Sequence, residues 1–428
     1  MKRYIFIGFF SLTMLQCIFG QTDSLSIYSL YDAIDAHYPS AHQIPALHES
    51  NEFKINAIQS GLYPRLSVNG QATYQSDVIE FGPGIDIPGE GISFPTPPRD
   101  QYKISLDVNQ VVYDGGIIKY KKKYENTGHE LSVREVEKEL FSIKKQVNDL
   151  YFYAMILDKN RELLQVSLNT ITERKEQVEA GINNGIFIKS DMESLMAEEL
   201  NIIQEISDIK AEKEVLVTII EDYTGMDIGK ETSFILPDVA LDTISKIQRL
   251  ENELFVIQQE QLAVAGDLKK ALIRPHFFAF GQAGYGNPGL KMVMDEFDTY
   301  YIIGAGMKWD LWDWQANKNE RQALEVQQRI IDYRQEAFKT NIKIALAREL
   351  SEYYQLKSKI ESEKKIVELR SKIARSAKSR LDNGVITSAE FISKINEETR
   401  SKIELENAKI MLVNKVVNYQ TLKGIMFN

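Results

Sequence analysis

Four stretches of the chain alternate apolar and polar side chains, and they fall into two pairs. In the first stretch Leu66, Val68 and Tyr74 stand on every second position, with polar residues such as Asn69 and Gln71 between them. A period of two is the spacing of side chains on one face of a β-strand. The alternation therefore predicts four two-faced strands, at about 65–75, 101–112, 276–285 and 299–310.

Two long helical segments follow the strand pairs, at 117–183 and 316–382. Apolar residues in the first segment recur with a 4-3 spacing, which is typical of a coiled-coil seam. Similar spacing resumes after an Asn-Gly pair, so each long segment is expected to fold back on a second helix as an antiparallel hairpin. The seam of the first segment consists of Val136, Leu140, Ile143, Val147, Leu150, Ala154, Leu157, Leu164, Leu168, Ile171 and Val178.

The two halves of the chain share landmarks at a constant offset of 199 residues. Landmarks that stay in register over about 70 residues indicate duplication of one structural unit. A continuous helix of 67 residues spans roughly 100 Å, far more than a compact domain needs. The matched residues are Asp114 and Asp313 in aromatic-Asp turns, Gly185 and Gly384 at the helix breaks, and Asp191 and Glu390 six positions later.

The connecting segments complete a mainly α chain with two equivalent halves. Helices are expected before each strand pair, over 22–62 with a break at Pro39 and from about Asp242 to Leu272. Residues 76–100 carry five Pro and four Gly, which predicts a loop. The expected organisation is a first repeat over 21–225, a linker over 226–241 and a second repeat over 242–428.

The N-terminus has the pattern of an export signal. Met1-Lys2-Arg3 precedes an apolar run from Tyr4 to Leu15, and Gly20 follows. A basic start, an apolar core and a small residue are typical of a signal peptide, so residues 1–20 are expected to be removed after Gly20. The single cysteine, Cys17, follows Gln16 instead of the small residue typical of a lipoprotein site. Its loss would leave a mature chain without structural disulfides.

Charge and motifs exclude several classes of function. The formal net charge is −10, and it becomes −12 when Lys2 and Arg3 leave with the signal, so a nucleic-acid partner is not expected. The histidines have no ligand spacing such as i, i+4, and no Gly-x-Ser-x-Gly motif occurs. We therefore expect no cofactor, no metal and no enzymatic activity. The histidines are His37, His42, His48, His129 and His276.

The strands pose a problem that one chain cannot solve. Strands of 9–11 residues with one apolar face have the length and pattern of membrane-barrel strands. Beyond the signal no apolar run of about 18 residues occurs, so no membrane-spanning helix is expected. Outer-membrane barrels contain at least about eight strands, and only a wider barrel holds water. Four strands per chain therefore predict a trimer or larger assembly. Tyr74, Tyr102, Tyr300, Tyr301 and Trp309 are candidates for an interfacial aromatic belt.

Taken in order, these features resemble the TolC-like family of outer-membrane efflux and secretion channels. The resemblance rests on the Pro before each first strand, the aromatic-Asp turn after each strand pair and the Gly-x5-acidic pattern at each helix break, and it covers nearly the whole mature chain. It implies a homotrimer with a 12-stranded β-barrel in outer-membrane lipid and a periplasmic α-barrel. It further implies a passive exit duct of a tripartite efflux pump or type I secretion system, with a periplasmic adaptor protein and an inner-membrane transporter as partners.

The resemblance also assigns candidate site residues at the two helix breaks. The tips that dock the adaptor correspond to Asn184, Gly185 and Ile186 and to Asn383, Gly384 and Val385. The residues of the periplasmic gate correspond to Asp191 and Glu390. An Arg that better-known members carry two positions after the second Gly is Ile386 here, a second acidic ring position is Ser393, and a Tyr three positions before the Gly is Leu381. Arg380 is the nearest basic residue and is expected to replace that Arg as the partner of Asp191.

Other interpretations of the same patterns remain open at this stage. Asn-Gly pairs are turn formers on any helix, and acidic residues near a helix start stabilise it without any gate. Two soluble hairpins on a coiled coil would describe a periplasmic scaffold protein, and the 76–100 loop would suit an adhesin. The sequence does not identify the cargo, the partner transporter or whether Cys17 is lipidated.

Overall fold

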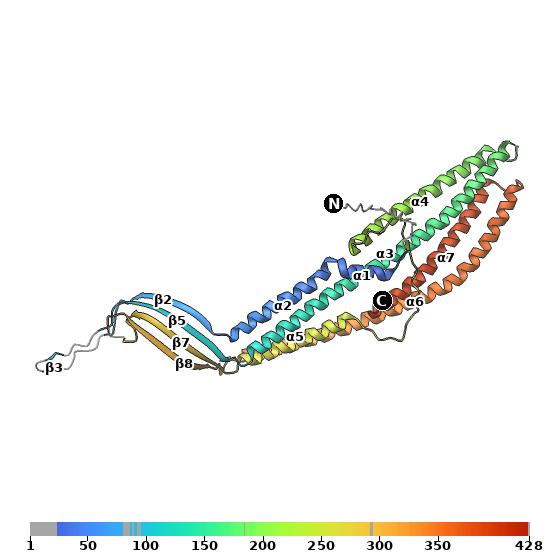
Figure 1. Ribbon diagram of the computed structural model, residues 1–428. Coiled ribbons are helices and arrows are strands. Elements are labelled where there is room, and N and C mark those ends of the chain that lie inside the picture. The colour runs from blue at the N-terminus through green and yellow to red at the C-terminus, as the bar shows by residue number, and fades with distance from the viewer. Residues whose placement is uncertain are drawn as a thin grey trace, which may run out of the picture.

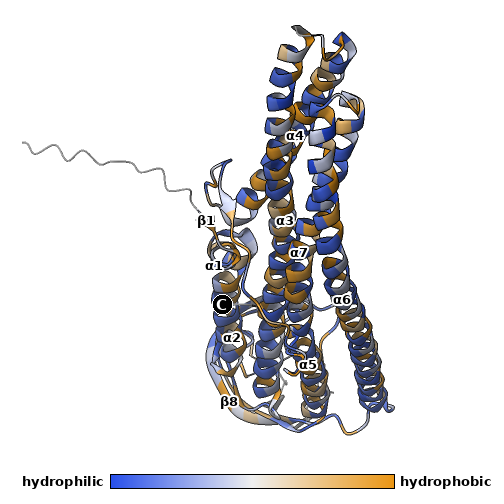
Figure 2. Cartoon of the chain, turned by 90° about the vertical axis from the view of Figure 1, so that its right-hand side faces the viewer, coloured by the Kyte–Doolittle hydropathy of each residue, from blue (hydrophilic) through white to orange (hydrophobic). Residues whose placement is uncertain are grey.

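The computed structural model describes residues 24–79, 86–87, 90–91, 96–183, 185–291 and 294–426. The predicted signal peptide over 1–20 and Asn184 lie outside these residues. The chain is elongated, with a β-sheet at one end and long helices running away from it to two tips at the other end (Figure 1). Each long helix carries hydrophilic and hydrophobic residues along its whole length (Figure 2).

Two helical hairpins form most of the molecule. The helix α3 (Ile117–Asn183) and the helix α6 (Ala316–Asp382) each contain 67 residues, which is about 100 Å of helix. They fold back into α4 (Lys189–Thr224) and α7 (Ser388–Lys423), which contain 36 residues each. The shorter helices are α1 (Ile27–His37), α2 (Gln43–Gln59) and α5 (Leu250–Leu272). No helix in the described part of the chain is both long enough and apolar enough to cross a membrane.

The sheet is antiparallel and has the order β2-β5-β7-β8. Its strands are β2 (Arg65–Tyr74), β5 (Asp100–Tyr113), β7 (His276–Asn287) and β8 (Asp298–Lys308). Two further pairs are short, β1 (Ser24–Leu25) with β6 (Ser233–Phe234), and β3 (Asp86–Ile87) with β4 (Glu90–Gly91). Both outer strands of the four-stranded sheet, β2 and β8, have one edge without a strand partner among the described residues.

The sheet has one apolar and one polar face, because registered residues on neighbouring strands share a face. Val68, Leu106, Ala283 and Tyr301 form one such row across all four strands. We call this side the apolar sheet face, and its large side chains are between 44% and 81% exposed. They are Leu66, Val68, Tyr74, Tyr102, Ile104, Leu106, Tyr285, Tyr301, Ile303 and Met307.

On the polar sheet face, Asp107 accepts hydrogen bonds from Asn69, Ser105 and Gln282 on three strands. The structure corrects one member of the expected aromatic belt. Tyr300 is registered with Gly284 on the polar face and is only 8% exposed, because its ring fills the space where Gly284 lacks a side chain. Trp309 is exposed and donates from Nε1 to the carbonyl oxygen of Ile273 at 3.1 Å.

The aromatic-Asp turns join strands to helices, as the sequence predicts. The Asp114 carboxylate accepts hydrogen bonds from the N–H groups of Gly116 at 2.8 Å and Ile118 at 2.6 Å. Asp313 accepts from the N–H of Asn317 at 2.8 Å. Each carboxylate thus satisfies N–H groups that the first turn of a helix leaves unpaired.

The expected helix from Asp242 begins later than predicted, at Leu250. The Asp242 carboxylate accepts hydrogen bonds from the Ser245 hydroxyl and from the N–H groups of Ser245 and Ile244, which lower its pKa to about 2. Gln248 then donates its N–H to the carbonyl oxygen of Lys423 at 2.6 Å. These bonds hold residues 242–248 as a turn against the end of α7 and compete with a helix.

The core lies between the helices, and it includes most of the predicted seam. Val147, Leu157, Ile171 and Val178 are almost fully buried, whereas Leu150 and Leu168 are only partly buried. The core also buries two tyrosine hydroxyls. Tyr31 donates to Oδ1 of Asn148 at 2.5 Å, and the Tyr151 hydroxyl lies 2.8 Å and 2.6 Å from the carbonyl oxygens of Leu25 and Ile235.

These tyrosines predict instability at alkaline pH. Burial is the main cause that raises the pKa values of Tyr31 and Tyr151 in the folded chain, whereas an unfolded tyrosine has a pKa of about 10. A raised folded pKa contributes stability that is complete below pH ~10 and is lost as pH rises towards the folded value. The thermal midpoint of helicity, followed by circular dichroism, should therefore fall above pH ~10.

The double substitution Tyr31→Phe with Tyr151→Phe is expected to reduce that alkaline fall, because Phe has no hydroxyl to ionise. At neutral pH the same variant should be less stable by about 1–3 kcal/mol, since buried partners such as Asn148 lose a hydrogen bond. The exposed Tyr354 provides the control. If the thermal midpoint fell with rising pH equally in the double variant and in Tyr354→Phe, this account would be contradicted.

Candidate functional site at the helical tips

The two helical tips lie at the same end of the molecule, away from the sheet (Figure 1). They have the same backbone geometry. Gly185 and Gly384 have positive φ values of 72° and 67°. Each donates its N–H to a carbonyl three residues earlier, Ile182 at 3.0 Å and Leu381 at 2.9 Å.

The residue after each glycine donates a second hydrogen bond, to a carbonyl oxygen five residues earlier. Ile186 donates to the carbonyl oxygen of Gly181 at 2.9 Å, and Val385 donates to that of Arg380 at 2.8 Å. The pair of bonds at each tip is a Schellman motif, which needs a residue in the left-handed region and therefore favours glycine. Ile186 and Val385 are exposed, so both tips present an apolar side chain on a tight backbone turn.

Asp191 joins the two tips. Its Oδ2 accepts from the N–H of Ile188 at 3.3 Å, at the start of its own helix α4. Its Oδ1 accepts from the N–H of Ser388 at 3.0 Å, in the first turn of α7 in the other hairpin. One carboxylate thus lies at the N-termini of two helices, where both helix dipoles stabilise negative charge.

Arg380 and Glu390 form a pair within the second hairpin. Their side chains approach at 3.7 Å, between Nη1 and Oε1, and are 52% and 47% exposed. The expected pairing of Arg380 with Asp191 does not form within the described chain, where Arg380 lies against Glu390 and the Asp191 carboxylate accepts backbone N–H groups. An exposed pair of this kind contributes only about 0–1 kcal/mol.

A further set of contacts between the tips involves Arg174, which the sequence did not indicate. Arg174 on α3 is 3% exposed and forms an ion pair with Asp382 at the end of α6. Its guanidinium lies 5.9 Å from the ring centroid of Phe187 and 5.7 Å from that of Phe391, distances typical of cation–π contacts. We call Arg174, Asp382, Phe187 and Phe391 the tip cluster.

One sequence signal for this cluster exists in retrospect. Arg174 lies three residues after Ile171 and four before Val178, so it shares a helix face with two seam residues. A buried charge on an apolar helix face requires a partner, and here that partner, the half-exposed Asp382, comes from the other hairpin. Nε and Nη2 of Arg174 have no hydrogen-bond partner among the described residues.

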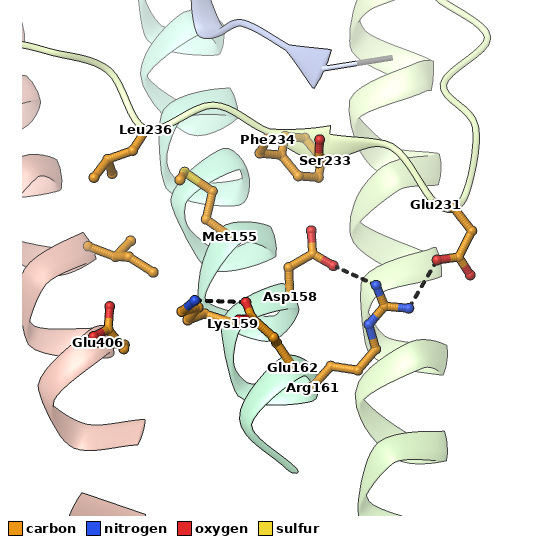
Figure 3. Close-up of a pocket in the computed structure, with 11 residues that line it drawn as sticks. Met155, Asp158, Lys159, Arg161, Glu162, Glu231, Ser233, Phe234, Leu236 and Glu406 are labelled. Carbon is orange, nitrogen blue, oxygen red and sulfur yellow. Dashed lines mark hydrogen bonds and ion pairs between the residues drawn. The ribbon is translucent and has the colours of Figure 1, made fainter. Parts of the chain in front are cut away.

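A second concave region lies near the middle of the rods, where the 225–249 segment crosses α3 (Figure 3). Its volume is about 450 Å³, and apolar side chains such as Met155, Phe234 and Ile410 line it.

The charged side chains of this pocket already form ion pairs. Arg161 lies 3.0 Å from Glu231, and this hydrogen bond lowers the pKa of the Glu231 carboxyl. Lys159 lies 2.7 Å from Glu162, and Lys409 lies 2.6 Å from Glu406. The pocket therefore lies where the two hairpins pack together, and neighbouring side chains neutralise its charges.

No protein-family model matches the sequence, and curated proteins give no match. Solved structures do match over nearly the whole chain. The CmeC outer membrane channel of Campylobacter jejuni is 14% identical, with a TM-score of 0.69 over 93% of this chain and 85% of the other. The outer membrane protein VceC of Vibrio cholerae is 14% identical, with a TM-score of 0.69 over 94% of this chain and 97% of the other.

A third match is CusC, whose structures concern transmembrane channel formation. It is 11% identical, with a TM-score of 0.72 over 92% of this chain and 91% of the other. This chain has the fold of these outer-membrane channels. At such identities the likeness is one of fold, and it does not carry over individual site residues.

The tip geometry predicts opposite effects for two kinds of Gly→Ala substitution. In Gly185→Ala and Gly384→Ala the added Cβ meets open space, but the alanine backbone must adopt the left-handed conformation. This conformation costs about 1–2 kcal/mol for a residue with a Cβ. Gly266→Ala in α5 is the matched control, because its Cβ also meets open space without a positive φ. That control should stabilise the helix by about 0.5–1 kcal/mol. Thermal melting followed by circular dichroism measures both, and a higher midpoint for Gly384→Ala would contradict the assignment.

Proposed function

We propose that the chain is one subunit of a passive outer-membrane exit duct, built from three copies. The observation that carries the proposal is the four-stranded sheet, whose apolar face is exposed and whose two edges have no strand partner among the residues that the structure describes. The likeness in fold to outer-membrane channels supports it.

The apolar sheet face favours a lipid environment. Exposed large apolar side chains on this scale are unfavourable in water, at roughly 25 cal/mol per Å² of apolar surface. In lipid the same side chains are stabilised, but the open edges of β2 and β8 then lack hydrogen-bond partners, at several kcal/mol for each unpaired group. Pairing of β8 in one copy with β2 in the next removes both edges. Three copies provide twelve strands, enough to enclose water.

The long hairpins extend this duct into the periplasm. In this proposal α3 and α6 continue from the strands through the Asp114 and Asp313 corners, so the helices of three copies form an α-barrel below the sheet. The two halves, 21–225 and 242–428 with the linker 226–241, are then copies of one unit that supplies two strands and one hairpin each. Solutes pass through by diffusion, and no chemistry is performed on them.

The tips are the proposed docking and gating region. Gly185 with Ile186, and Gly384 with Val385, present small, exposed turns that suit contact with the helical hairpin of a periplasmic adaptor. Asn383, and Asn184 outside the described residues, belong to the same proposed docking region. Asp191, Glu390 and Arg380 are proposed gate residues, to which we add the tip cluster. Opening requires the second hairpin to move relative to the first, so contacts between the hairpins oppose it. An inner-membrane transporter is the proposed source of energy.

A soluble periplasmic scaffold is the competing interpretation. It leaves the apolar sheet face and the edges of β2 and β8 without a function. It also differs from the duct in an observable way, since a scaffold would dissolve without detergent.

Neighbouring residues of β8 provide a matched test of the membrane assignment. Ile303 points to the apolar sheet face and Ile302 to the polar face. Ile303→Lys should cost about 2–4 kcal/mol in the membrane and reduce the yield of detergent-extracted trimer, measured by native mass spectrometry. Ile302→Lys should preserve that yield. A wild-type chain that is monomeric and soluble without detergent would exclude the duct.

Conductance in planar bilayers tests the gate. Arg174→Met removes the ion pair between hairpins and should raise the closed-state leak about fivefold, equivalent to ~1 kcal/mol. Arg380→Ala should raise it less, because its pair with Glu390 is exposed and lies within one hairpin. Arg400→Ala, at an exposed position of α7, is the control. An equal closed-state leak in the Arg174→Met and Arg400→Ala channels would show that the tip cluster does not contribute to closing the duct.

A further inference from the structure

Two histidines that are far apart in the sequence meet between α2 and α3. Nδ1 of His48 and Nε2 of His129 are 3.0 Å apart. The ring centroids lie 4.7 Å apart with an interplanar angle of 65°. His48 is exposed and His129 half-buried, so both rings can be reached from solvent. Their separation of 81 residues explains why chain spacing alone gave no ligand pattern.

Polar contacts with α3 surround the histidine pair, from α2 and from the short 3-10 helix Pro39–His42 before it. Ser40 donates to Glu139 at 2.7 Å, Asn51 donates to Asn126 at 3.2 Å, and Lys54 lies 2.7 Å from Glu125. These contacts and the histidine pair follow one another along the contact with α3, which runs antiparallel to α2. No residue of α2 is fully buried, and its apolar contribution comes from Ile44 and Leu47, which are partly buried and pack against the core.

The distance between the two nitrogens suits a metal ion. With metal–nitrogen bonds of about 2.05 Å, nitrogens 3.0 Å apart subtend an angle of about 94° at a bound ion. A tetrahedral angle needs a separation of roughly 3.3 Å. The observed value is closer to the right angle between neighbouring ligands in tetragonal complexes, the geometry that Cu²⁺ and Ni²⁺ adopt with nitrogen donors.

We infer that His48 and His129 form a two-histidine site for a divalent transition-metal ion, Cu²⁺ or Ni²⁺, which bridges α2 to α3. Among the described residues no group of three or more His, Cys, Asp or Glu side chains is placed to hold a metal, so water completes the coordination. Binding is a ligand exchange without electron transfer. The ring that donates the present hydrogen bond moves that proton to its other nitrogen, and both rings then ligate as neutral imidazoles.

Copper titration of the full chain in detergent tests the site. Chelator-treated protein is titrated with Cu²⁺ and followed by electron paramagnetic resonance, where nitrogen ligands split the signal. We expect one saturable nitrogen-ligated site per chain. His48→Gln and His129→Gln should each weaken it at least about tenfold, or roughly 1.4 kcal/mol. His42→Gln and His276→Gln are matched controls that should leave it unchanged.

A second measurement tests the bridge between the helices. Hydrogen exchange of the backbone amides in 43–59 should slow when Cu²⁺ binds the wild-type chain, but not when it is added to the His48→Gln, His129→Gln double variant. Superimposable copper titrations of the wild type and the double variant would overturn the site. Saturable binding without slower exchange in α2 would assign copper to a single histidine and overturn the bridge. Neither result depends on whether the chain conducts.

Discussion

The backbone of β2 and β8 imposes the constraint on which the rest of the structure depends. Each outer strand has a row of N–H and C=O groups without a strand partner in the described chain, next to a face of exposed apolar side chains. Water satisfies the edges but not the face, and lipid satisfies the face but not the edges. Association of several copies in lipid would satisfy both, and this combination of hydrogen bonding and burial is the basis of the proposed assembly.

The same logic extends to the corners and the tips, where helix ends must satisfy their own backbone groups. Asp114 and Asp313 accept the first N–H groups of α3 and α6, and Gly185 and Gly384 close their last turns. These devices allow long helices to lie next to sharp reversals. The chain therefore combines long rods with compact turns at both ends.

The tips add polar contacts to the apolar packing that runs along the rods. An apolar cluster that includes Val178, Leu381 and Phe391 reaches the tips, and there a buried guanidinium, Arg174, and one carboxylate, Asp191, also connect the two hairpins. Charged and hydrogen-bonded contacts are specific in geometry and are weakened by water once they separate. These contacts therefore fix how one tip is placed against the other.

The sequence by itself determined the local elements, because strand alternation, coiled-coil spacing and glycine at helix breaks depend on near neighbours. Alternation predicted both faces of the sheet, and the 4-3 spacing predicted the buried side of α3. Only the tertiary structure decided the contacts between distant segments. Asp242 belongs to a turn against the end of α7, Tyr300 fills the space above Gly284, and Arg174 meets Asp382 across two hairpins. His48 meets His129 for the same reason, since such pairings depend on how helices and strands pack and leave no periodic trace in the chain.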